Sequence, residues 1–170
     1  VAKSLRINTD VINHRKFKDR VSFDLALATK LAEYEPDLIL LAGFMRILSD
    51  TFLSQFTGKI LNIHPSLLPS FPGTKTHSNA LKSGVRIHGC TVHFVTTQLD
   101  AGPIIIQAAV PVMQIDTPES LATRVLREEH KIYPMAVRWF LEDRLSILNN
   151  KVLLDDEIQK SGSLIFPFSK

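Results

Sequence analysis

Hydrophobic and polar residues follow two different periods along this chain. Between Ser22 and Tyr34 the apolar residues recur at the spacing of one helix face, which predicts an amphipathic helix. Asp37–Ala42 is instead a continuous apolar run before Gly43, which is typical of a strand covered on both faces. The same reasoning predicts further helices at Ser49–Phe56, around Asn79–Leu81 and at Thr117–Glu142, and further strands at Lys59–Ile63, Ile87–Thr96 and Ile104–Val112.

The alternation of helices and strands predicts an α/β fold, with an open, mostly parallel, twisted sheet flanked by helices. Ile87–Thr96 and Ile104–Val112 follow each other closely, so we expect them to pair as an antiparallel hairpin. The tail predicts a second small hairpin over 144–154 and a loose end from Ser161. We expect residues 1–170 to form a single domain, because no repeat or low-complexity tract divides them.

Composition and charge favour a globular protein that handles small molecules. Apolar residues make up 45% and charged residues 22% of the chain, which is ordinary for such a protein. The net charge of +3 includes no long basic block, so we expect anionic small molecules rather than nucleic acid as partners. The single cysteine, Cys90, excludes an internal disulfide, and no apolar run has the length of a membrane span. We therefore predict a cytoplasmic protein without membrane contact.

The strongest candidate chemistry lies at Asn62 and His64, at the end of a predicted strand. Side chains two residues apart on a strand point to the same side. An amide that can hydrogen-bond a carbonyl oxygen therefore lies beside an imidazole that can move a proton near neutral pH. A carboxylate delivered from another strand end would complete a set suited to acyl transfer without a covalent intermediate. The other histidines show no metal-ligand spacing, and we expect no metal.

Three sequence runs resemble the phosphoribosylglycinamide formyltransferases: Asn62–Pro69, His88–Val95 and Leu99–Pro103. Methionyl-tRNA formyltransferases usually have alanine, and formyltetrahydrofolate hydrolases usually have histidine, where this chain has Pro65. The resemblance implies a formyl transfer from 10-formyltetrahydrofolate to the amine of glycinamide ribonucleotide, in de novo purine biosynthesis, by direct attack through a tetrahedral intermediate. The reduced folate would be a co-substrate rather than a tightly bound cofactor.

The resemblance also implies a role for individual residues. The catalytic set would be Asn62, His64 and Asp100, although an aspartate in an Asp-Ala-Gly-Pro turn has by itself no special meaning. The folate would be bound by Arg20, Met45, Arg46, Ile47, Leu48, Asn62, Val95 and Thr96, and the nucleotide by Gly43, Pro65 and Glu129. Glu129 also stands out independently, because its charge interrupts the apolar face of the predicted 117–142 helix. Leu126 departs from the family, which often has a polar residue there near the substrate phosphate.

The resemblance implies a preceding βαβ segment, with a phosphate-binding loop, that has no counterpart in this sequence. The first glycine is Gly43, so we expect no Gly-rich phosphate loop. Two other functions therefore stay open: hydrolysis of 10-formyltetrahydrofolate, and folate binding by a non-catalytic fragment. For the assembly we expect a monomer or a weak homodimer.

Overall fold

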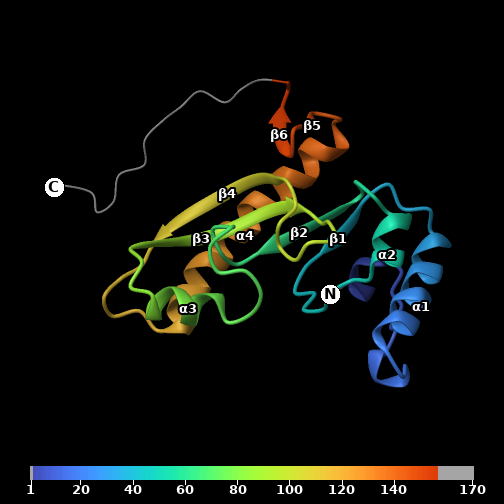
Figure 1. The fold of residues 1–170 in the computed structure, drawn as a ribbon, viewed down its shortest axis with the longest axis horizontal. Coiled ribbons are helices and arrows are strands. Elements are labelled where there is room, and N and C mark those ends of the chain that lie inside the picture. The colour runs from blue at the N-terminus through green and yellow to red at the C-terminus, as the bar shows by residue number, and fades with distance from the viewer. Residues whose placement is uncertain (1, 157–170) are drawn as a thin grey trace.

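The structure is a computed structural model that describes residues 2–156 (Figure 1). Within this range the central sheet contains, in spatial order, β1 (Ile39–Leu41), β2 (Ile60–His64), β3 (Ile87–Phe94) and β4 (Ile104–Pro111). The α-helices are α1 (Arg20–Ala32), α2 (Asp50–Gln55), α3 (Thr76–Lys82) and α4 (Pro118–Leu141), and short 3₁₀ turns cover Lys3–Leu5 and His14–Lys16. A separate antiparallel hairpin consists of β5 (Leu145–Leu148) and β6 (Lys151–Leu154).

The predicted helices are confirmed, and capping side chains explain their first residues. The Asp19 carboxylate accepts a hydrogen bond from the backbone N–H of Ser22, so α1 begins at Arg20, two residues before the predicted start. The Ser49 hydroxyl caps α2 in the same way. At α4, Thr117 and Ser120 form a reciprocal capping box, followed by a proline in the first turn. Side chains short enough to reach the backbone therefore determine where these helices start.

The α/β class and both antiparallel hairpins are confirmed, but the direction of the strands needs a correction. Only β1 and β2 pair in parallel, whereas the β2–β3 and β3–β4 pairs are antiparallel. The β3–β4 pair is the predicted hairpin, so the expectation of a mostly parallel sheet is wrong at the β2–β3 pair, which leaves one parallel pair within residues 2–156. After β2 the chain turns through a loop and α3 and enters β3 beside the end that β2 has just left. A parallel neighbour would need a crossover back to the other end of the sheet.

The two faces of the sheet are covered by different elements. On one face, Val92 of β3 packs with Leu121 and Val125 of α4 in one core cluster. On the other face, Ile60 of β2 packs with Phe52 of α2 in a second cluster, which also includes residues of α1 and β1. Figure 1 shows α1 and α2 gathered at the β1 end of the sheet. The second face is consequently left without a helix where β2 and β3 carry polar residues, and this is where the candidate site lies.

Cys90 lies in the first of these core clusters and is fully buried. Burial raises the pKa of its thiol to about 12, so the thiol stays protonated and unreactive at neutral pH. Among the described residues no helix is long and apolar enough to cross a membrane. The loose end predicted from Ser161 lies outside the described residues.

Candidate active site

Two rows of polar residues cross the open face of the sheet. In the first row, Asn62 of β2 lies opposite His93 of β3. In the second row, His64 of β2 lies opposite Thr91 of β3, which in turn lies opposite Gln107 of β4. Side chains two residues apart on a strand lie on the same face, so both rows lie on the same face of the sheet. The pairing of the strands thus adds three polar residues to the two that the sequence indicated.

Asp100 reaches this face from the loop between β3 and β4. Its Oδ2 lies 3.6 Å from Nδ1 of His64, and its Oδ1 lies 4.0 Å from Nε2 of His93. The carboxylate is held by the backbone N–H of Gly73, which donates a 2.7 Å hydrogen bond to Oδ2. Only 9% of the Asp100 side chain is exposed. The structure therefore brings Asn62, His64 and Asp100 together in a nearly buried group.

The hydrogen bonds of His64 indicate which ring nitrogen carries a proton. Its Nε2 lies 3.1 Å from the carbonyl oxygen of Phe71. A carbonyl oxygen can only accept, so Nε2–H is the donor, and in the neutral ring Nδ1 has the lone pair. That lone pair faces the Asp100 carboxylate. A second proton at Nδ1 would convert this contact into an ion pair.

His93 is the site residue that the sequence analysis missed. Its Nδ1 lies 2.8 Å from the carbonyl oxygen of Phe94, and its Nε2 lies 3.3 Å from Nδ2 of Asn62. With Nδ1–H donating to the carbonyl, Nε2 accepts from the Asn62 amide. Burial lowers the pKa of His93, which keeps the ring neutral and Nε2 available as an acceptor. The alternation of side chains along the strand places His93 on one face, but only the register with β2 places it beside Asn62.

The buried His88 and the half-buried His77 form a separate pair. Nε2 of His88 lies 3.2 Å from Nδ1 of His77, and the His88 ring meets the Phe71 ring edge-on. Burial lowers the pKa of His88 to about 4. A neutral, enclosed ring that packs against Phe71 has a structural role.

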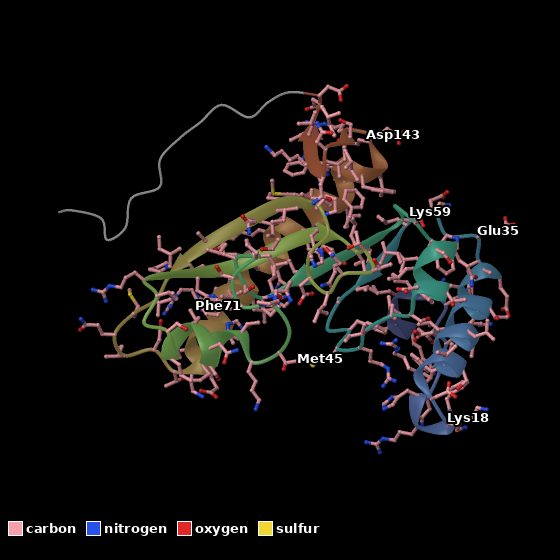
Figure 2. The ribbon with its side chains drawn as sticks, viewed as in Figure 1. Lys18, Glu35, Met45, Lys59, Phe71 and Asp143 are labelled. Carbon is pink, nitrogen blue, oxygen red and sulfur yellow. The ribbon has the colours of Figure 1, made fainter. Side chains whose placement is uncertain are left out.

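Most of the residues implied to bind folate lie on the loops after β1 and β3, whereas Asn62 lies in β2 and Arg20 is the first residue of α1. Met45 and Ile47 are exposed and Leu48 is buried, and Met45 lies between Phe71 and Lys18 in the view of Figure 2. The Arg46 guanidinium lies 4.9 Å from the centre of the Phe23 ring. Across from this loop, Val95 packs against the same core cluster as Phe44, while the side chains of Thr96 and Arg20 are exposed.

The residues implied to bind the nucleotide are more dispersed. Gly43 turns the chain after β1 with a φ of +64°, and Pro65 follows His64 directly. Glu129 is half-buried on α4, and its carboxylate makes no hydrogen bond or ion pair with residues 2–156. Burial raises the pKa of Glu129, whereas the charges of His130 and His64 act to lower it. Such a carboxylate is suited to accept hydrogen bonds from a bound ligand.

No group of three histidine, cysteine or acidic side chains among residues 2–156 is arranged to hold a metal ion. The Asn62 amide, the His64 imidazole and the Asp100 carboxylate supply a hydrogen-bond donor, a proton carrier and a proton acceptor. These three groups can stabilise an oxyanion and move protons at neutral pH.

The sequence and the structure are similar to those of known proteins. Residues 1–137 match the family model described as formyl transferase. The phosphoribosylglycinamide formyltransferase of Escherichia coli K12 is 45% identical over 156 residues, covering 92% of this chain and 74% of that protein. The human trifunctional purine biosynthetic protein adenosine-3 is 53% identical over 137 residues, covering 81% of this chain and 14% of that protein.

Among solved structures, glycinamide ribonucleotide transformylase 1 from Symbiobacterium toebii superimposes with a TM-score of 0.87 at 48% identity. The match covers 90% of this chain and 72% of that one. The family model covers well over half of the sequence, and the structural match extends over nearly all of it. The chain belongs to the formyl transferase family.

Proposed function

We propose that this chain transfers the formyl group of 10-formyltetrahydrofolate to the amine of glycinamide ribonucleotide. The observation that carries the proposal is the convergence of Asn62, His64 and Asp100 on one face of the sheet, with 3.6 Å between His64 Nδ1 and Asp100 Oδ2. The relatives named above carry out this reaction according to their names. An amide donor, a protonatable imidazole and a carboxylate are the groups that a formyl transfer by direct attack requires.

In the proposed mechanism the nucleotide amine attacks the formyl carbon, and a new C–N bond forms as the carbonyl oxygen becomes an oxyanion. One N–H of Asn62 is directed to His93, which leaves the other for this oxyanion. Protonated His64 stabilises the oxyanion by its positive charge, since its two N–H groups are directed to the Phe71 carbonyl and to the Asp100 carboxylate. Asp100, with a water molecule, moves the proton from the attacking amine to N10 of the folate as the C–N10 bond breaks. Holding the two substrates side by side supplies much of the acceleration.

Substrate binding divides between two regions in this proposal. The folate lies along the loop of Met45, Arg46, Ile47 and Leu48, against Val95 and Thr96, with Arg20 near its anionic end. The nucleotide lies along Gly43, Pro65 and Glu129, and the Glu129 carboxylate accepts hydrogen bonds from its ribose hydroxyls. We further infer that no cofactor is tightly bound, and that the enzyme is cytoplasmic and a monomer or a weak homodimer.

The test is a formyl-transfer assay of the chain with 10-formyltetrahydrofolate, with and without glycinamide ribonucleotide, in parallel with the His64→Ala variant. Loss of the formyl group that needs the nucleotide and disappears in the variant supports the transferase. Formate release without the nucleotide indicates a hydrolase. Folate binding without turnover indicates a non-catalytic fragment. Either of the last two outcomes, or near-normal turnover by His64→Ala, rejects the proposal.

A further inference from the structure

The polar row across the sheet ends at Gln107, a residue of the edge strand β4 that lies away from the candidate catalytic group. Its Nε2 donates hydrogen bonds of 2.9 Å to the carbonyl oxygen of Leu68 and of 2.9 Å to Oγ1 of Thr91. Thr91 stands between Gln107 and His64 in the register and is completely buried. Gln107 is thus hydrogen-bonded both to Thr91 of the polar row and to Leu68, in the loop that passes over this row.

Thr91 and Gln107 together anchor the segment Pro65–Gly73, which we call the site loop. The Thr91 hydroxyl donates to the carbonyl of Ser66 at 2.6 Å and accepts from the N–H of Leu68 at 3.1 Å. Since Gln107 bonds the Leu68 carbonyl, both backbone polar groups of this residue are held. A Cβ at Gly89 of β3 would overlap the carbonyl oxygen of Ala108 and would also lie 2.9 Å from Leu67 Cδ2, so the glycine allows both to approach. The first half of the site loop is therefore fixed on the sheet.

The second half of the site loop holds the two groups that handle protons. The Phe71 carbonyl accepts from His64 Nε2 at 3.1 Å, and the Gly73 N–H donates to Asp100 Oδ2 at 2.7 Å. Within the loop, the Ser66 hydroxyl donates to the Ser70 carbonyl at 2.6 Å, which links the anchored half to this one. A displacement of the anchored half is therefore transmitted to His64 and Asp100.

We propose that Gln107 is a positioning residue for the formyl transfer, acting through Thr91 and the site loop on His64 and Asp100. The inference rests on the proposed function and adds a residue that touches neither substrate in it. Its role is to keep the proton of neutral His64 on Nε2 and its Nδ1 directed at the carboxylate. Loss of the anchor lets the ring and the carboxylate move apart, and small displacements of reacting groups are costly in rate.

The test compares Gln107→Met, which keeps the length of the side chain and removes its donor, with Gln114→Met in the exposed loop before α4. We expect kcat of Gln107→Met to fall by about tenfold to about a hundredfold while KM for both substrates changes little. The acid limb of its kcat/KM profile should shift as well. In ¹⁵N NMR of the full chain, His64 should change from the Nε2–H tautomer to a mixture. Gln114→Met should match the parent in all of these readouts.

A second pair of variants separates positioning from folding. Thr91→Ser keeps the hydroxyl and should keep the Nε2–H tautomer and most of the activity, whereas Thr91→Val should behave as Gln107→Met does. An unchanged tautomer and kcat in Gln107→Met overturn the inference. The tautomer is measured without substrate, so it still decides this inference if the parent chain proves inactive and the proposed function fails.

Discussion

Asn62 of β2 and His93 of β3 face each other across the sheet, with 3.3 Å between Nδ2 of Asn62 and Nε2 of His93. Nδ1–H of His93 donates a hydrogen bond to the Phe94 carbonyl, so in the neutral ring Nε2 can only accept. The Asn62 amide is thereby oriented, with its nitrogen on the His93 side. This orientation presents its second N–H to a ligand, which is the direction that an oxyanion requires.

Replacing the Asn62 amide by a carboxylate tests this orientation. Asn62→Asp keeps the shape of the side chain but removes both N–H donors and sets an oxygen against the His93 lone pair. We expect kcat to fall by about a hundredfold or more, as is usual when such a donor is lost. Steady-state kinetics with both substrates checks this, with circular dichroism as the control for folding. A folded variant with kcat within a few-fold of the parent would show that Asn62 does not stabilise the oxyanion.

Glu129 and Glu128 are neighbours on α4 and form a matched pair for a binding test. The Glu129 carboxylate is half-buried, whereas Glu128 forms a 2.7 Å ion pair with Lys131. We expect Glu129→Gln to raise KM for the nucleotide by about tenfold, because hydrogen bonds to a charged acceptor are worth about 1.5–3 kcal/mol. KM for the folate should stay constant, and Glu128→Gln should change neither constant. An equal effect of both variants would contradict a ribose contact by Glu129.

The sequence pattern predicted those parts of the site that depend on local periodicity. Asn62 and His64 were paired from their spacing on one strand, and Glu129 was noticed as a charge on an apolar helix face. His93 and Gln107 could not be placed in this way, because their contacts depend on the antiparallel register of β3 with its neighbours. That register follows from the path of the chain through the site loop and α3, which has no simple sequence period.

His88 makes stability depend on pH. The side chain is 1% exposed, and burial lowers its pKa from 6.5 to about 4. Between these values the unfolded chain binds a proton that the folded chain does not, so stability falls as the pH decreases through this window. The loss should reach about 3 kcal/mol, by the free energy per pKa unit. Urea unfolding at several pH values measures it.

A non-titrating variant isolates the contribution of this ring. His88→Gln should have a flatter dependence of unfolding free energy on pH between 6.5 and 4, even if it is less stable at neutral pH. The control is Gln114→Met, at an exposed position without a titrating group in the loop before α4, which should keep the slope of the parent. The same slope in His88→Gln and in the parent would assign the acid sensitivity to other groups.

Gly102 follows Asp100 in the loop between β3 and β4, and its backbone lies very close to the Phe94 carbonyl of β3. A Cβ at this position would overlap the carbonyl oxygen of Phe94, so the loop would have to move. We expect Gly102→Ala to lower kcat by about tenfold to about a hundredfold by displacing the Asp100 carboxylate. Ala101→Ser, at the exposed neighbouring position, should have little effect. Full activity of a folded Gly102→Ala protein would mean that the loop can shift without moving the carboxylate.

The Asp116 carboxylate joins the end of β4 to the start of α4. Its two oxygens accept from both terminal nitrogens of Arg124, at 2.7 and 2.8 Å, from the N–H of Met113 and from the hydroxyl of Ser120. Arg124 also donates to the carbonyl of Pro111, at 2.8 Å. The guanidinium holds the pKa of Asp116 well below its usual range, so the ion pair persists in mild acid.

Asp116→Asn should therefore destabilise the fold by about 2 kcal/mol, because one oxygen becomes an NH₂ group that faces other donors. The loss of stability should be smaller than for a fully buried ion pair, because 27% of the Arg124 side chain is exposed to solvent. Urea unfolding at neutral pH measures the difference. The control is Asp155→Asn, which removes the exposed pair with Arg144 and should change stability little, since solvent screens it. If the two substitutions have equally small effects, the Asp116–Arg124 pair does not anchor α4, and the capping box at Thr117 and Ser120 is sufficient to begin the helix.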